Sequence, residues 1–400
     1  MAARALGNGD VLGALRLVAL REDATALALR GVAMAQLGEL TRAKELFRRA
    51  RLALPAREAV QRARVSLAEA EVALAARELA ISRRAIEQAG ETLRLAGDRG
   101  NVAFARVLEI QRLVLSGDVA EAVAQLSSLS LAGALPATVV RAELLHVEIA
   151  SRLLDAPRAR SALERARRAA RRANIAALSL EIERASQTLA GPVLRMIVGG
   201  VEEPLRLDEV ERVLASRSLV IDALRRKVGT SGELVTLARR PVLFSLLRTL
   251  GECFPGEGSR ELLIARAFGA KRTDASHRAR LRVEMARLRR AVSPFARVEA
   301  TPAGFVLVPR RAKDVVVLAP PFDGENGAIR ALLSDGQAWS SAAVAVALGM
   351  SQRTVQRILF ALERDGHVVA RGRARMRRWF APPIAGFSTT LLLPGAFGFA

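Results

Sequence analysis

The chain has 400 residues, which is too many for a single hydrophobic core, so we expect several domains. With 51% hydrophobic and 26% charged residues it is not a disordered chain, and its formal net charge of +22 points to a polyanionic partner. A single cysteine excludes disulfide bonds within the chain, and 4% aromatic residues with no tyrosine favour duplex over single-stranded nucleic acid.

Residues 1–190 form the first predicted domain, an array of amphipathic helices running from Asp10 to about Leu189. In the unit from 24 to 57, the small, aromatic and proline positions of a helical repeat are held by Gly31, Ala43, Phe47, Ala50 and Pro55. Small residues allow paired helices to approach closely, and proline stops the second helix. This unit resembles a tetratricopeptide repeat, and roughly three later units match the pattern loosely.

Repeat arrays of this kind expose a concave groove. The resemblance therefore implies that the first domain binds a protein partner or a small effector. A dimerisation or packing arm that binds no ligand is an equally open interpretation.

Residues 191–313 form the second predicted domain, which opens after Gly191 and Pro192 with a β-branched run. The pattern predicts a strand over 193–198, a helix over 205–216, and strands over 219–228 and 233–237 with a turn between them. Three helices follow, over 241–254, 259–268 and 274–292. Alternation then predicts a hairpin made of 297–300 and 305–309.

Hairpin, three helices and hairpin is the element order of a winged helix. Several short sequences resemble the effector domain of OmpR/PhoB-type response regulators: Leu237-Ala-Arg-Arg-Pro-Val-Leu-Phe-Ser-Leu-Leu, Arg260-Glu-Leu, Leu288-Arg-Arg and Val298-Glu-Ala-Thr-Pro-Ala-Gly-Phe-Val-Leu. No receiver domain with a phosphoacceptor aspartate precedes them. Phosphorelay control is therefore not implied, and the helical array stands in place of that input module.

The resemblance implies that the third helix of this domain enters the major groove of DNA. At 100° per residue, its buried stripe is predicted to be Leu281, Met285, Leu288 and Val292. Region 271–313 carries 12 basic and 3 acidic residues, which fits contact with a polyanion. Candidate base or phosphate contacts on and just before this helix are Arg272, Ser276, His277, Arg280 and Arg287.

Residues 322–393 form the third predicted domain, with helices over 328–333 and 340–348 and a third helix beginning at Gln352. Gly349 suits a left-handed corner between the second and third helices, and Ser351 is a typical N-cap. The run Gln352-Arg-Thr-Val-Gln-Arg-Ile-Leu resembles the DeoR-like helix-turn-helix domains of bacterial repressors. Strands over 367–371 and 377–380 flank a basic loop, and this predicts a second wing.

The third helix of this domain is predicted to bury Val355, Ile358, Leu359 and Leu362 and to turn its glutamine and arginine side chains outward. Those residue types pair with adenine and guanine edges. Trp379 is expected to pack in the core or at the base of the wing. Candidate DNA contacts on the helix and wing are Ser351, Gln352, Arg353, Thr354, Gln356, Arg357, Arg371, Arg373, Arg375 and Arg377.

Catalysis is not expected. None of the 3 histidines stands in a metal-ligand spacing or beside a nucleophile motif, and neither GxxxxGK[ST] nor GxGxxG occurs. We therefore expect neither a cofactor nor a metal. The N-terminus does not resemble a secretory signal and the charge-free stretches are poor membrane spans, so we expect a cytoplasmic, nucleoid-associated protein without membrane contact.

The expected fold class is mainly α: a helical-repeat array followed by two winged helix-turn-helix domains with small β-hairpin wings. The leading hypothesis is a sequence-specific regulator of transcription that binds double-stranded DNA and, through its array, a protein partner or effector. The sequence leaves open whether the chain forms a homodimer. The alternative is a non-catalytic protein-interaction scaffold whose charge reflects genomic base composition, since only 4 of the 62 basic residues are lysines.

Overall fold

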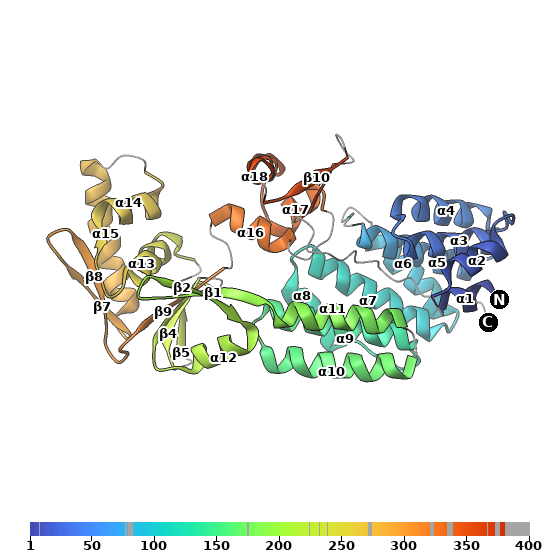
Figure 1. Cartoon of the computed structure of the whole chain (residues 1–400), viewed down its shortest axis with the longest axis horizontal. Coiled ribbons are helices and arrows are strands. Elements are labelled where there is room, and N and C mark those ends of the chain that lie inside the picture. The colour runs from blue at the N-terminus through green and yellow to red at the C-terminus, as the bar shows by residue number, and fades with distance from the viewer. Residues whose placement is uncertain are drawn as a thin grey trace. The chain divides into compact units, whose positions relative to one another are not determined.

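The computed structural model describes residues 1–7, 9–76, 78, 83–173, 176–223, 225–231, 233–237, 239–270, 274–320, 324–333, 339–365, 367–372 and 377–380. Within these ranges the chain is mainly helical, with 18 helices and three sheets (Figure 1). It divides into two compact units, one made of Met1–Thr188 with Ala328–Ala400 and the other of Leu189–Gly327. No helix in the described part of the chain is both long enough and apolar enough to cross a membrane.

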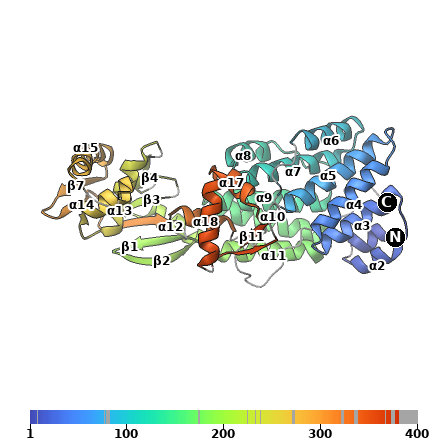
Figure 2. The same ribbon diagram turned by 90° about the horizontal axis from the view of Figure 1, so that it is seen from above.

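The first unit begins with a helical array, in which no described residue forms a strand. Helices α3, α5, α7 and α9 contact one another in succession, and the helix between each two packs beside its neighbours (Figure 1 and Figure 2). In chain order the helices are α1 (Ala2–Gly7), α2 (Val11–Val18), α3 (Ala24–Gln36), α4 (Leu40–Ala53), α5 (Ala59–Ala75), α6 (Arg83–Leu95), α7 (Arg99–Leu115), α8 (Val119–Ser127), α9 (Pro136–Arg152), α10 (Ala156–Ala173) and α11 (Ala176–Ala190).

The contact predicted between paired helices is present at α3 and α4. A Cβ atom placed on Gly31 would lie 2.9 Å from Cε1 of Phe47, so glycine lets the aromatic ring approach the α3 backbone. Helix α4 ends at Ala53, just before Pro55, as the sequence predicts. Phe47 and Ala50 are fully buried between the two helices and their neighbours.

A buried charged pair links three helices of the array. Glu71 of α5 is 3% exposed and forms an ion pair with Arg141 of α9, whose guanidinium lies 6.0 Å from the ring centroid of Phe104 on α7. Burial raises the pKa of Glu71 to about 7, and the favourable charge of Arg141 only partly opposes this effect.

The first unit also contains the C-terminal module, by which we mean the described residues between Ala328 and Phe380, with the end of one helix, two whole helices and two strands. These elements are α16 (Gly324–Leu333), α17 (Ser341–Leu348), α18 (Gln352–Arg364), β10 (Val369–Arg371) and β11 (Arg378–Phe380). The apolar core of this module is continuous with that of α5, α6 and α7. At one contact, a Cβ atom on Gly117, in the turn between α7 and α8, would lie 2.7 Å from the carbonyl oxygen of Ala347.

The second unit contains a six-stranded sheet of order β2-β1-β9-β3-β4-β5, in which only β3 and β9 run parallel. Its strands are β1 (Pro192–Val198), β2 (Val201–Arg206), β3 (Leu219–Asp222), β4 (Lys227–Thr230), β5 (Glu233–Thr236) and β9 (Val315–Ala319), with α12 (Leu207–Ala215) between β2 and β3. The prediction of one strand over 219–228 is wrong, because the chain turns after Asp222 and returns as β4, with Arg226 at φ +51°.

Two strands of this sheet were not predicted: β9 lies outside the predicted elements, and β2 includes the first two residues of the helix predicted over 205–216. Strand β2 is an edge strand in which only Leu205 is buried, so it lacks the alternation that marks a strand. Strand β9 is buried at every residue, and it lies beyond position 313, where the predicted domain ends. Its five apolar residues occupy the centre of the sheet, a position that depends on pairing with β1 and β3 far away in the sequence.

Three helices and a three-stranded antiparallel sheet complete the second unit. The helices are α13 (Pro241–Cys253), α14 (Arg260–Phe268) and α15 (Ala275–Val292), and the sheet has the order β6-β8-β7, with β6 (Gly258–Ser259), β7 (Ala296–Ala300) and β8 (Gly304–Pro309). The predicted hairpin is present as β7 and β8. Helix α13 packs on the six-stranded sheet at Gly251, where a Cβ atom would collide with Ile221 and lie 2.9 Å from Cγ2 of Val317.

Candidate nucleic-acid interface

Helix α15 has the buried stripe that its sequence predicts. Leu281, Met285, Leu288 and Val292 are its buried residues, and they pack into the core formed with α13, α14 and the hairpin. At the start of the helix the Asp274 carboxylate accepts a hydrogen bond of 2.8 Å from the backbone amide of His277. This bond, with the nearby imidazole, lowers the pKa of Asp274, so the cap is a carboxylate at neutral pH.

The side of α15 opposite its buried stripe carries the predicted contacts. Ser276, Arg280 and Arg287 are exposed, whereas His277 is half-buried and stacks against Phe268 with 6.4 Å between ring centroids. The Arg280 guanidinium lies 4.4 Å from the centroid of the same phenyl ring, a cation–π contact that holds the charge at the surface. Arg272 lies outside the described residues.

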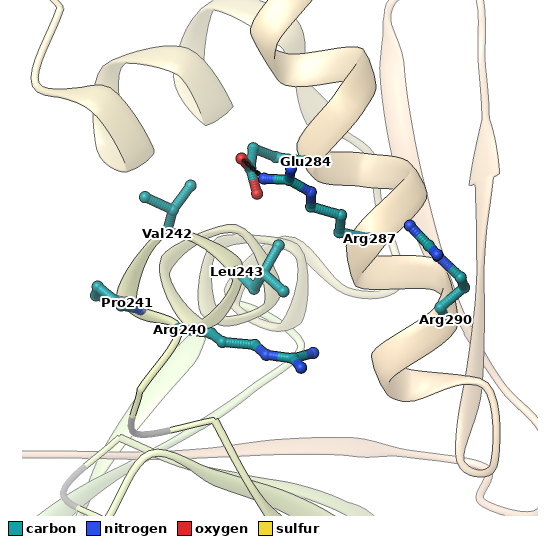
Figure 3. Close-up of a pocket in the computed structure, with 7 residues that line it drawn as sticks. All are labelled: Arg240, Pro241, Val242, Leu243, Glu284, Arg287 and Arg290. Carbon is teal, nitrogen blue, oxygen red and sulfur yellow. Dashed lines mark hydrogen bonds and ion pairs between the residues drawn. The ribbon is translucent and has the colours of Figure 1, made fainter.

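A pocket adjoins this face at the start of α13 (Figure 3). Its volume is about 560 Å³, and Arg240, α13 and α15 provide its described lining. Arg287 is joined there to Glu284 by an ion pair of 2.8 Å. The lining residues are Arg240, Pro241, Val242, Leu243, Glu284, Arg287 and Arg290.

The α17–α18 corner has the predicted backbone conformation. Gly349 adopts a left-handed conformation at φ +62° and ends α17. A residue with a Cβ atom would adopt this conformation only at a greater steric cost. The Ser351 hydroxyl accepts a hydrogen bond of 3.1 Å from the amide of Thr354 and lies 2.8 Å from its hydroxyl. These two hydroxyl groups therefore fix the first turn of α18, and the outward side chains beyond them are presented from a capped helix.

The predicted buried stripe of α18 is also confirmed, because Val355, Ile358, Leu359 and Leu362 are its buried residues. Thr354 is half-buried. Four polar and cationic side chains outside the stripe are exposed: Gln352, Arg353, Gln356 and Arg357. One exposed helix face thus combines two amides with two guanidinium groups, the groups that can form paired hydrogen bonds with base edges.

Strands β10 and β11 pair where a second wing is predicted, with Arg371 opposite Arg378. Arg377 is held inside the module: its guanidinium lies 4.5 Å from the Trp379 ring centroid and 4.6 Å from that of Phe360. It also forms an ion pair of 2.6 Å with Glu363. Arg377 therefore braces β11 against α18, whereas Arg373, Arg375 and the side chain of Arg371 lie outside the described part of the structure.

Two arginines beside the candidate face of α15 are not among the predicted contacts. Arg240 precedes α13 and lines the pocket, and Arg290 reaches the same pocket from the exposed side of α15. The available signal was the sequence Arg239-Arg240-Pro241, since proline at the first position of a helix places the preceding cation beside the positive end of that helix. An arginine there is unfavourable for the helix unless an anion lies nearby.

The described residues hold no cluster of histidine, cysteine, aspartate and glutamate that could bind a metal ion. Comparison of the chain with protein-family models, with curated proteins and with solved structures finds no match.

Proposed function

We propose that the chain is a regulator of transcription that binds double-stranded DNA in a sequence-dependent way through α15 and α18. The observation that carries this proposal is that both helices bury an apolar stripe and expose arginine on the opposite side. A third helix of this kind, exposed beside a hairpin, is the element that enters the major groove in helix-turn-helix proteins. The formal net charge of +22 favours a polyanionic partner.

The element order supports two winged helix-turn-helix domains in this proposal. In the second unit, α13, α14 and α15 are followed by the β7–β8 hairpin, which pairs with the short strand β6. In the C-terminal module, α16, α17 and α18 are followed by the β10–β11 pair. Each hairpin then serves as a wing beside its recognition helix.

The array contributes a partner or effector site in this proposal. A groove of about 770 Å³ runs between α4 and α6 over α5, and alanine residues of α5 and α6 form much of its lining. Lys44 and Arg51 stand in its walls, paired with Glu78 and Glu69 respectively. The succession of contacts α3–α5–α7–α9 supports a tetratricopeptide-like arrangement of these helices.

A salt titration with labelled duplex DNA tests the proposal. If six to ten phosphates are contacted, affinity falls about 10³- to 10⁵-fold between roughly 50 and 200 mM salt. A flat response, or equal affinity for a duplex and for an unrelated polyanion such as heparin, would favour the interaction scaffold and contradict DNA recognition.

A further inference from the structure

The pocket between the start of α13 and α15 has a lining in which positive charge exceeds negative charge. Four of its seven described lining residues are charged, three of them arginines and one a glutamate, which gives these residues a net charge of +2. Figure 3 shows Arg240 extending from the start of α13 toward α15, and Arg287 meeting Glu284. Two of the three arginines are therefore left without a carboxylate inside the pocket.

Arg240 and Arg290 are both exposed, and neither side chain forms an ion pair with any residue that the structure describes. The pairing of Arg287 with Glu284 neutralises the single acid and fixes one guanidinium at the wall. An uncompensated guanidinium pair at a pocket is a common anion-binding arrangement, because its planar N–H groups match the oxygens of phosphate.

The first turn of α13 adds a second source of positive potential. Arg240, the N-cap residue, forms no side-chain capping bond, and Pro241 has no amide hydrogen. Val242 and Leu243, the next two residues of the helix, also line the pocket, and their amides are among those that a helix start leaves without an intrahelical partner. Helix starts of this kind attract phosphate oxygens, and here the effect acts together with Arg240 and Arg290.

We propose that this pocket binds a phosphate of the DNA backbone when α15 lies in the major groove. The inference rests on the DNA-binding function proposed above. Arg287 and Arg290 line the pocket and also belong to the exposed side of α15, so a backbone passing along that side reaches it. None of the lining residues that the structure describes is aromatic, so among them the base of a free nucleotide finds no stacking partner, and this favours the backbone as the source.

The test is the salt dependence of DNA binding by the full-length chain and by two single variants. Arg240→Ala removes one phosphate contact, so the slope of log affinity against log salt is expected to decrease in magnitude by about 0.9. Arg239→Ala is the matched control, because this neighbouring arginine is also exposed but does not line the pocket. Equal slopes for the two variants would overturn the proposal.

Glu284→Gln tests the same site in the opposite direction. It removes the one carboxylate of the described lining and is expected to tighten DNA binding at low salt, whereas Arg240→Ala weakens it. If Glu284→Gln leaves affinity unchanged while Arg239→Ala and Arg240→Ala behave alike, the pocket takes no part in binding DNA.

Calorimetric titration with inorganic phosphate in the absence of DNA separates the two sources of the anion. One possible result is that the unmodified chain binds phosphate saturably and Arg240→Ala abolishes this binding, while the variant keeps the DNA salt slope of the unmodified chain. That result would assign the pocket to a free anion and overturn the backbone assignment. If the unmodified chain fails to bind DNA at all, the proposed function fails. The phosphate titration then decides separately whether the pocket binds an oxyanion. The absence of a saturable heat signal would overturn oxyanion binding by the pocket as well.

Discussion

Replacing Gly117 by alanine tests whether the C-terminal module is packed on the array. Gly117 has φ +84°, and an added Cβ would lie 2.7 Å from the Ala347 carbonyl oxygen of α17. Gly97→Ala is a matched control, because Gly97 also precedes an aspartate in an array turn, at φ +73°, and nothing lies within 4 Å of a Cβ added there. The two variants therefore share a backbone penalty and differ in one contact.

The expected magnitudes follow from that comparison. An alanine in the left-handed region destabilises the folded state by about 1–2 kcal/mol. Replacing glycine by alanine also lowers the conformational entropy of the unfolded chain, and this offsets about 0.4–1 kcal/mol of the loss. Both effects apply equally at Gly97 and Gly117. The forced contact with a backbone oxygen adds about 1–3 kcal/mol at Gly117 alone, as overpacking does in other cores.

Tryptophan emission is a selective assay for this effect. The chain has 2 tryptophans, Trp339 and Trp379, both 1% exposed in the C-terminal module and joined by reciprocal backbone hydrogen bonds of 2.7 and 2.8 Å. In urea, the emission midpoint of Gly117→Ala should fall clearly below that of Gly97→Ala, while circular dichroism follows the helices of the whole chain. Identical emission midpoints for the two variants would refute the packing of α17 on the α7–α8 turn.

Two further variants probe the cores. Gly251→Ala should lower the free energy of unfolding by about 1–3 kcal/mol, because the added methyl group collides with Ile221 and crowds Val317. This loss should exceed the gain from the better helix propensity of alanine. Unchanged stability in urea would contradict the contact between α13 and the sheet. The raised pKa of Glu71 means that the native state holds more protons than the unfolded state between about pH 4.5 and 7, so the stability of the unmodified chain relative to Glu71→Gln should fall as pH rises through that window. A pH-independent difference would show that Glu71 stays ionised beside Arg141.

Local pattern was sufficient to predict the two exposed helix faces. The spacing of Leu281, Met285 and Leu288 fixes which side of α15 is buried, and the same 100° step fixes the buried side of α18. Gly349 and Ser351 mark the corner before α18 because each residue type suits the backbone geometry at its position. The directions of the outward arginines follow from these local constraints.

Features that depend on distant segments could not be predicted in the same way. Strand β9 carries no alternation because both of its faces are buried, and its partners β1 and β3 are about 100 residues away in the sequence. The packing of Arg377 between two aromatic rings depends on the position of α18 relative to β11. Its basic neighbours in the sequence made it resemble a wing contact instead.

Selection of duplexes from a random pool tests the central claim most directly. The unmodified chain should enrich a defined sequence, and Arg353→Ala with Arg357→Ala should lose the part of that sequence read by α18 while keeping its fold. A double variant at two exposed array arginines, Arg16→Ala with Arg42→Ala, removes the same charge and should enrich the original sequence. DNA reading by α18 would be contradicted if the unmodified chain enriched no sequence. It would also be contradicted if both double variants enriched the same sequence.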